Sequence, residues 1–95
     1  AYEPLWAIGT GRAATPIDAA DAAAFIRSTV EAAGGPAAAA GLRVQYGGSV
    51  QAENAADFLA EPDIDGLLVG GASLQAASFA EVIRAVGGCY RSPAA

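Results

Sequence analysis

The stretch Ala1-Tyr2-Glu3-Pro4-Leu5-Trp6-Ala7-Ile8-Gly9-Thr10-Gly11-Arg12 determines how the rest of the chain is interpreted. Proline disfavours the helical conformation at the residue before it, so Glu3 is expected to stay extended at the end of a strand. Pro4 cannot donate a hydrogen bond to a β-ladder and therefore marks the end of that strand. Gly9 and Gly11 would let backbone N–H groups approach a ligand closely. The stretch predicts a strand, a carboxylate, and a loop that can move and hold an anion.

A long helix is expected after this loop. Thr15-Pro16-Ile17-Asp18 is typical of a helix start, with Thr15 as N-cap, proline at the first helical position and an acid in the first turn. The helix should run to about residue 33, where Gly34-Gly35-Pro36 ends it. Helical spacing places an apolar set on the inward face: Ala22, Phe25, Ile26 and Val30. It places a charged set on the outward face: Asp18, Asp21, Arg27 and Glu31. Residues 37–41 read as a connecting surface loop.

Two further strand and helix pairs are expected downstream. Residues 42–46 form a short strand, and a helix over about 53–60 follows, with Phe58 and Leu59 as buried anchors. Residues 64–69 form the next strand, whose apolar run suits a parallel sheet buried on both faces. Ser78-Phe79-Ala80-Glu81 has the spacing of a capping box and opens a last helix, in which Phe79, Val82, Ile83 and Val86 share a face. Gly87-Gly88 ends that helix, and residues 87–95 are expected to be a tail.

The alternation of strands and helices predicts right-handed β/α units and a parallel sheet. Two glycine pairs, Gly47-Gly48 and Gly70-Gly71, follow strands. The carboxyl ends of parallel strands are where β/α proteins place their active sites. Without reference to any family, the pattern indicates a phosphate-binding β/α protein.

Composition excludes several classes of function. The net charge is −5 with only five basic residues, which argues against a nucleic-acid surface. The single cysteine, Cys89, cannot form an internal disulfide and fits a reducing compartment. The chain has no histidine, so a histidine-based metal site or catalytic dyad cannot form within it. No apolar run approaches the roughly 20 residues of a membrane span.

Taken in order, the opening stretch, Tyr46-Gly47-Gly48-Ser49-Val50, and Asp65-Gly66-Leu67-Leu68-Val69-Gly70-Gly71-Ala72-Ser73-Leu74 closely resemble the C-terminal part of the triosephosphate isomerase family. The resemblance covers Ala1 to about Val86. It implies an α/β fold, the C-terminal part of a (β/α)8 TIM barrel with about three β/α units and parallel strands. Such a barrel needs roughly 250 residues, so the 95 residues are expected to be a fragment, one partial barrel domain over 1–95 with a lid loop at about 4–14.

The resemblance also assigns roles to individual residues. It implies that Glu3 is the catalytic base and that Ile8 on the lid and Leu68 on the last strand close over it as an apolar clamp. It implies that backbone N–H groups hold the substrate phosphate, at Gly9, Ser49, Gly70 and Gly71. Tyr46 and Ser49 resemble the residues that latch the closed lid, with Tyr46 reaching the backbone near Ala14. Arg12 stands where a lysine is common in the family, so lid contacts are expected to differ there.

The function implied is isomerisation of dihydroxyacetone phosphate and D-glyceraldehyde 3-phosphate through an enediolate, in glycolysis and gluconeogenesis. The family's electrophilic His and its substrate-binding Lys and Asn come from earlier strands, so the isolated chain is expected to be inactive. No metal or organic cofactor is implied. The full-length enzyme is expected to be a cytoplasmic homodimer, with no nucleic-acid or membrane partner. Two other interpretations stay open: another phosphate-binding β/α-barrel enzyme, and a noncatalytic phosphate-binding or interaction fragment.

Overall fold

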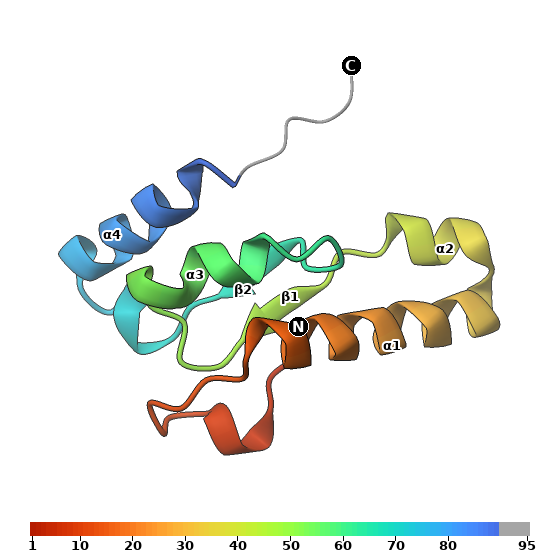
Figure 1. Cartoon of the computed structure of the whole chain (residues 1–95), viewed down its shortest axis with the longest axis horizontal. Helices are drawn as coiled ribbons and strands as arrows, with labels where there is room; N and C mark the ends of the chain where they lie inside the picture. The colour runs from red at the N-terminus through yellow and green to blue at the C-terminus, as the bar shows by residue number, and fades with distance from the viewer. Residues whose placement is uncertain (90–95) are drawn as a thin grey trace.

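The computed structural model describes residues 1–89, and residues 90–95, which belong to the expected tail, lie outside the described part. Strands and helices alternate along the chain, with one additional helix after the first (Figure 1). The elements are η1 (Leu5–Ala7), α1 (Pro16–Gly34), α2 (Pro36–Gly41), β1 (Gln45–Gly47), α3 (Ala52–Leu59), β2 (Gly66–Leu68), η2 (Gly71–Ser73) and α4 (Ala76–Gly87).

The predicted parallel strands are present, but they are short. β1 and β2 pair in parallel, with Tyr46 beside Leu67 in the register. On the other edge of β1, Tyr2 forms an isolated parallel bridge with Tyr46, in which the Tyr2 N–H donates to the Gln45 carbonyl at 2.8 Å. β1 therefore lies between the opening segment and β2. The expected first strand is reduced to this bridge, and the strands expected over 42–46 and 64–69 are three residues each.

Helices cover one face of this sheet and leave the other open. Tyr46 and Leu67 point toward α1, α3 and α4 and pack into the core. The Tyr46 ring stacks on Phe58 of α3, with centroids 4.1 Å apart. Because side chains alternate along a strand, Gln45 and Leu68 face the opposite side, and both are exposed. The sequence predicted that residues 67–69 are buried on both faces of the sheet. This prediction is wrong for Leu68, which is 45% exposed.

The start of α1 is as predicted, and its predicted inward face is correct in part, because Ile26 packs against the core. The Thr15 side chain accepts a hydrogen bond from the Asp18 N–H at 3.1 Å, and Pro16 opens the helix. Small alanines make the buried face, Ala19 and Ala23, so the helix can lie close to the sheet. Phe25, expected to face inward, is 73% exposed. The predicted loop at 37–41 is also wrong: Pro36 starts a second helix, α2, directly after the Gly35 break.

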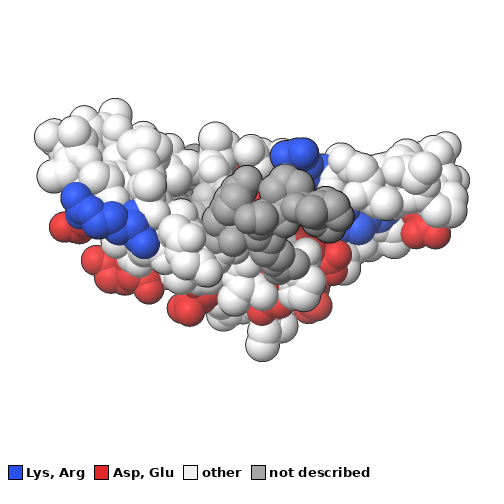
Figure 2. Space-filling view, turned by 90° about the horizontal axis from the view of Figure 1, so that it is seen from above, with Lys and Arg blue, Asp and Glu red and all other residues white. Residues whose placement is uncertain are grey.

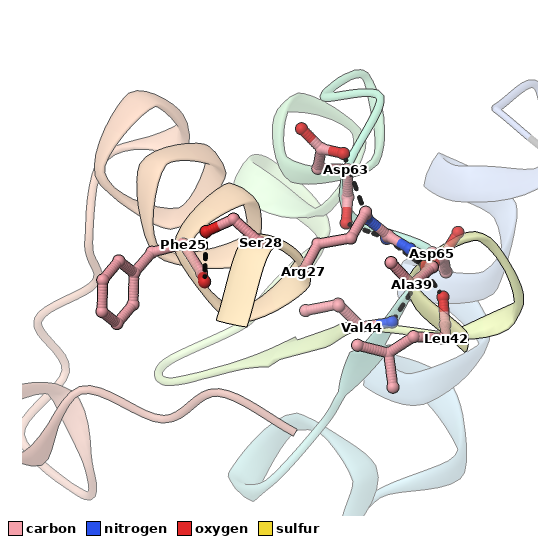
Figure 3. Close-up of polar contacts among 8 residues, drawn as sticks. All are labelled: Phe25, Arg27, Ser28, Ala39, Leu42, Val44, Asp63 and Asp65. Atoms are coloured by element: carbon pink, nitrogen blue, oxygen red, sulfur yellow. Dashed lines mark hydrogen bonds and ion pairs between the residues drawn. The ribbon is translucent and has the colours of Figure 1, made fainter. Parts of the chain in front are cut away.

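Arg27, expected to face outward, is the side chain that ties α1 to the entrances of both strands (Figure 3). Its guanidinium donates to the backbone carbonyls of Ala39 and Leu42 at 2.7 and 2.8 Å. It also forms ion pairs with Asp63 and Asp65, each at 3.3 Å. Arg carries five donors in a planar fork, which suits several acceptors at once. Helical spacing alone could not predict this inward charge, because its acceptors are contributed by distant segments.

α3 and α4 pack against each other beside the strands (Figure 1). Phe58 on α3 and Val82 on α4 are buried as expected, and Leu59 and Val86 pack partly against the core. The capping box predicted at residues 78–81 is wrong, because α4 starts at Ala76, before Ser78. The Ser78 hydroxyl donates instead to the Ala72 carbonyl at 2.6 Å and to the Gln75 carbonyl at 3.1 Å.

The opening loop projects beyond the helices and contains the short η1 turn (Figure 1). The Thr10 hydroxyl donates to the Trp6 carbonyl at 2.9 Å and accepts from the Arg12 N–H at 3.1 Å. The Arg12 guanidinium lies over the Trp6 ring, 5.2 Å from its centroid, which is within the range of a cation–π contact. These contacts give the loop its own internal structure.

The charged side chains do not form a basic patch on the face drawn in Figure 2, where blue Arg groups lie apart among red Asp and Glu groups. Within residues 1–89, no helix has the length and apolar character that crossing a membrane requires.

We expect the isolated 95-residue chain to self-associate or to remain partly molten. Large apolar side chains are exposed at Leu5, Trp6, Ile8, Ile17, Phe25, Leu68, Leu74, Phe79 and Ile83. A small chain with so much apolar surface exposed buries too little to offset its conformational entropy. Analytical ultracentrifugation with proton NMR measures this directly. A monodisperse monomer with sharp, dispersed methyl signals would show that the prediction is wrong.

Candidate functional site

An open cleft of about 580 Å³ lies at the carboxyl ends of the strands. Seven of the eight residues singled out from the sequence line it: Glu3, Ile8, Gly9, Ser49, Leu68, Gly70 and Gly71. The eighth, Tyr46, lies behind the cleft in the core, at 1% exposure. Segments separated by more than 60 positions in the chain are thus brought to one place, as expected for successive strand ends of a parallel sheet.

Glu3 lies over Gly47, and the geometry there leaves no room for a side chain. A Cβ built on Gly47 would lie 3.0 Å from Cγ and 3.1 Å from Oε1 of Glu3, and 3.2 Å from Cβ of Leu68. Gly47 therefore lets the carboxylate and Leu68 lie side by side at the strand ends. The apolar clamp is not closed here, because Ile8 and Leu68 are 51% and 45% exposed and Glu3 itself is exposed.

The Tyr46 hydroxyl joins the far end of the opening loop to the turn after β1. It accepts a hydrogen bond from the Ala14 N–H at 3.0 Å and donates to the Gly48 carbonyl at 3.0 Å. The resemblance implied a contact of Tyr46 with the backbone near Ala14, and this hydrogen bond is that contact. Burial raises the pKa of Tyr46 above its ordinary value, the Ala14 N–H opposes this rise, and Tyr2 nearby adds to it. Tyr46 therefore stays protonated and keeps its donor role at neutral pH.

Ser49 has a backbone conformation that residues other than glycine rarely adopt. Its φ is 55°, directly after Gly48 at φ 140°. The Ser49 hydroxyl donates to the Ala7 carbonyl at 3.0 Å, a contact between the β1 turn and the opening loop. Sequence reasoning missed Asn54, whose side chain donates to the Ser49 carbonyl at 3.0 Å. Its spacing, three residues after the helix N-cap Gln51, was the signal available in the sequence.

The Gly70-Gly71 turn leads into the short helix η2 at Gly71–Ser73. The Gly70 carbonyl accepts from the Ser73 N–H at 2.8 Å and from the Ser73 hydroxyl at 2.6 Å. In a trans peptide the N–H points opposite to the carbonyl, so the Gly71 N–H is directed away from Ser73. A Cβ at Gly70 or Gly71 would meet no atom of the described chain within 4 Å.

The cleft is lined by Glu3 and by the backbone of the glycine turns at Gly48-Ser49 and Gly70-Gly71. Within residues 1–89, no cluster of three or more His, Cys, Asp or Glu side chains is arranged to hold a metal ion. A carboxylate at one strand end and glycine turns at the next two define a β/α protein whose cleft lies where this class of protein binds its ligands.

Comparison with known proteins narrows this class to one family. The family model described as "Triosephosphate isomerase" matches residues 1–86. The chain is 60% identical over 83 residues to a triosephosphate isomerase of Moorella thermoacetica, a match that covers 87% of the chain and 33% of the relative. It is 59% identical over 85 residues to a triosephosphate isomerase of Symbiobacterium thermophilum, covering 90% of the chain and 33% of the relative.

The chain belongs to the triosephosphate isomerase family, because the family model covers nearly all of it. Its parallel α/β arrangement agrees with that assignment. It spans about a third of the length of the curated relatives that it matches.

We expect Tyr46→Phe to destabilise a full-length hybrid in which this chain replaces the matched segment of the Moorella thermoacetica relative. The change leaves the buried Ala14 N–H without its partner, which costs about 1–3 kcal/mol. Because the folded state raises the Tyr46 pKa, the parent's Tyr46 contribution is complete below about pH 10 and is lost as pH rises further. Urea unfolding at pH 8 and pH 11 should therefore show the free-energy difference between parent and variant shrinking at pH 11. If the difference in unfolding free energy between parent and variant is the same at both pH values, the raised pKa of the Tyr46 hydroxyl is wrong.

Proposed function

We propose that this chain is part of a triose-phosphate isomerase, which interconverts dihydroxyacetone phosphate and D-glyceraldehyde 3-phosphate. The observation that carries the proposal is that Glu3 and the two glycine turns line one cleft. A triose phosphate needs both features, a base for the carbon beside its carbonyl and an anion site a short distance away. The relatives named above are triosephosphate isomerases, which supports the same activity.

Glu3 would act as the general base. Its carboxylate takes a proton from the carbon beside the carbonyl, which leaves an enediolate. A proton then moves from one enediolate oxygen to the other, and the carboxylate returns its proton to the neighbouring carbon. A Glu base with loop closure that excludes water is the established example of this chemistry in this family. Ile8 and Leu68 line the same cleft as Glu3. Movement of the opening loop, over about residues 4–14, would bring Ile8 over the carboxylate and dry it, which strengthens the base.

The phosphate would be held by backbone N–H groups and not by basic side chains. We assign this role to Gly9, Ser49, Gly70 and Gly71, all of which line the cleft. Within residues 1–89 no arginine lines the cleft, so the dipoles of the backbone would supply the positive potential. Tyr46 and Ser49 would stabilise the closed loop through their contacts with Ala14 and Ala7.

We further propose that the chain is the C-terminal third of a (β/α)8 barrel, with residues 1–95 forming a partial barrel domain. The support is the order of three motifs along the chain. These are Glu3 with the opening loop, the turn at Ser49, and the Gly70-Gly71 pair. In this order they resemble the ends of the family's last three strands. The exposed Leu68 on the open face would then pack against the remaining strands. The full-length enzyme would be a cytoplasmic homodimer acting on a small triose phosphate.

We expect the hybrid, with this chain in place of the last third of the Moorella thermoacetica relative, to isomerise triose phosphate. Glu3→Asp in that hybrid keeps the carboxylate and withdraws it by about one methylene. Proton transfer depends steeply on position, so kcat should fall at least about tenfold while phosphate binding is largely retained. Steady-state kinetics and calorimetry with inorganic phosphate measure the two effects.

A kcat for Glu3→Asp within about twofold of the parent would show that Glu3 is not the base. A well-folded hybrid that binds phosphate but lacks isomerase activity would favour another phosphate-binding barrel enzyme. A hybrid that folds and does not bind phosphate would favour a noncatalytic role. Failure of this hybrid to fold, with folding restored when the chain replaces the first third, would contradict the C-terminal placement.

We expect Gly71→Ala to weaken binding of a phosphate-bearing transition-state analogue to the hybrid by at least about tenfold, or ~1.4 kcal/mol. The new methyl group meets no atom of residues 1–89 within 4 Å, so in this assignment its effect comes from crowding the anion. Ser49→Ala keeps the backbone N–H and removes the hydroxyl that contacts Ala7, so it should cost less. Calorimetry gives both affinities, and thermal melts show that both variants fold. If Gly71→Ala binds as tightly as the parent, the glycine pair is only a turn.

A further inference from the structure

The turn between β1 and α3 is held by a side chain to which the resemblance assigns no role. Asn54, in the first turn of α3, donates through Nδ2 to the Ser49 carbonyl at 3.0 Å. Its Oδ1 accepts from the Gln51 N–H at 2.8 Å. A backbone N–H can only donate and a carbonyl can only accept, so these two partners fix which way the Asn54 amide faces.

The residue held by Asn54 is the one in the least favourable backbone conformation. Ser49 has φ 55°, and among the described residues it alone, apart from glycines, has a positive φ. Such a conformation costs free energy and persists only where the surroundings hold it. The Asn54 hydrogen bond fixes the carbonyl of Ser49, and with it the orientation of the peptide that follows.

Ser49 is also the point where the turn meets the opening loop. Its hydroxyl donates to the Ala7 carbonyl at 3.0 Å. The chain of contacts therefore runs from the α3 terminus through Asn54 to Ser49, and from Ser49 to the loop that carries Ile8. A small rotation at Ser49 would displace both its backbone N–H and this loop contact.

We propose that Asn54 is a positioning residue of the phosphate subsite. By bonding the Ser49 carbonyl, it holds Ser49 in the left-handed conformation that presents the Ser49 N–H to the phosphate and the hydroxyl to the loop. The inference rests on the proposed function, because that function places the phosphate at Ser49. Asn54 itself touches neither the phosphate nor the reacting carbons in this assignment.

The decisive variant is Asn54→Asp in the hybrid. A carboxylate still accepts from the Gln51 N–H and suits the first turn of a helix, so α3 should remain capped. It cannot donate to the Ser49 carbonyl, so that hydrogen bond is lost and the carboxylate oxygen repels the Ser49 carbonyl oxygen instead. We expect the Kd for inorganic phosphate to rise three- to tenfold, the range of one hydrogen bond, with Tm changed by no more than about 2 °C. KM for triose phosphate should rise more than kcat falls.

The added charge is controlled with the double variant Glu53→Gln/Asn54→Asp, which keeps the net charge of the parent. If the double variant binds phosphate as weakly as Asn54→Asp, lost positioning is responsible. If the double variant restores the parent Kd, or if Asn54→Asp leaves Kd within twofold of the parent, the inference is overturned and Asn54 only caps α3. A folded parent hybrid that does not bind phosphate overturns the proposed function, and with it this inference.

Discussion

The contacts of Tyr46 connect every part of the structure that matters for the site. Its ring stacks on Phe58 and is almost fully buried, so β1 and α3 are held together through one side chain. Its hydroxyl bonds the Ala14 N–H and the Gly48 carbonyl, which joins the core to the opening loop and the first glycine turn. Burial strengthens these hydrogen bonds. It also means that a buried donor or acceptor left without its partner costs free energy. The position of the loop relative to the cleft therefore depends on packing around Tyr46.

The two ends of the strands have different physical characters. At the entrances, Arg27 joins α1 and the carbonyls at the end of α2 to Asp63 and Asp65 through several charge-assisted hydrogen bonds. At the carboxyl ends, glycines replace side chains and leave an open cleft beside Glu3. The same division between a stabilising end and a functional end is general in β/α proteins. The polar contacts of Arg27 and the open cleft thus lie at opposite ends of the strands.

Glycine is required at the cleft for more than one reason. At Gly47 the obstacle is steric, because a methyl group would meet Glu3 and Leu68. At Gly48 it is both steric and conformational, since φ is 140° and a Cβ would lie 3.0 Å from the Tyr46 hydroxyl. At Gly70 and Gly71 the chain itself leaves the space open, which is consistent with room for a ligand there. Ser49 then completes the turn in a strained conformation that Asn54 and the Ala7 contact hold.

The sequence by itself determined the alternation of strands and helices, the Thr15 cap and the glycine pairs after the strands. These follow from local rules: proline and glycine restrict the backbone at their own positions, and parallel strands place successive carboxyl ends at one edge. The individual residues around the cleft were implied by the resemblance to a known family. Only the tertiary structure decided that Arg27 faces inward, that residues 36–41 are helical, and that Ser78 bonds Ala72 and not the start of its own helix. It also brought Asn54 to Ser49. Each of these depends on an acceptor or a packing surface whose position is set by how the whole chain folds, and no local pattern encodes that position.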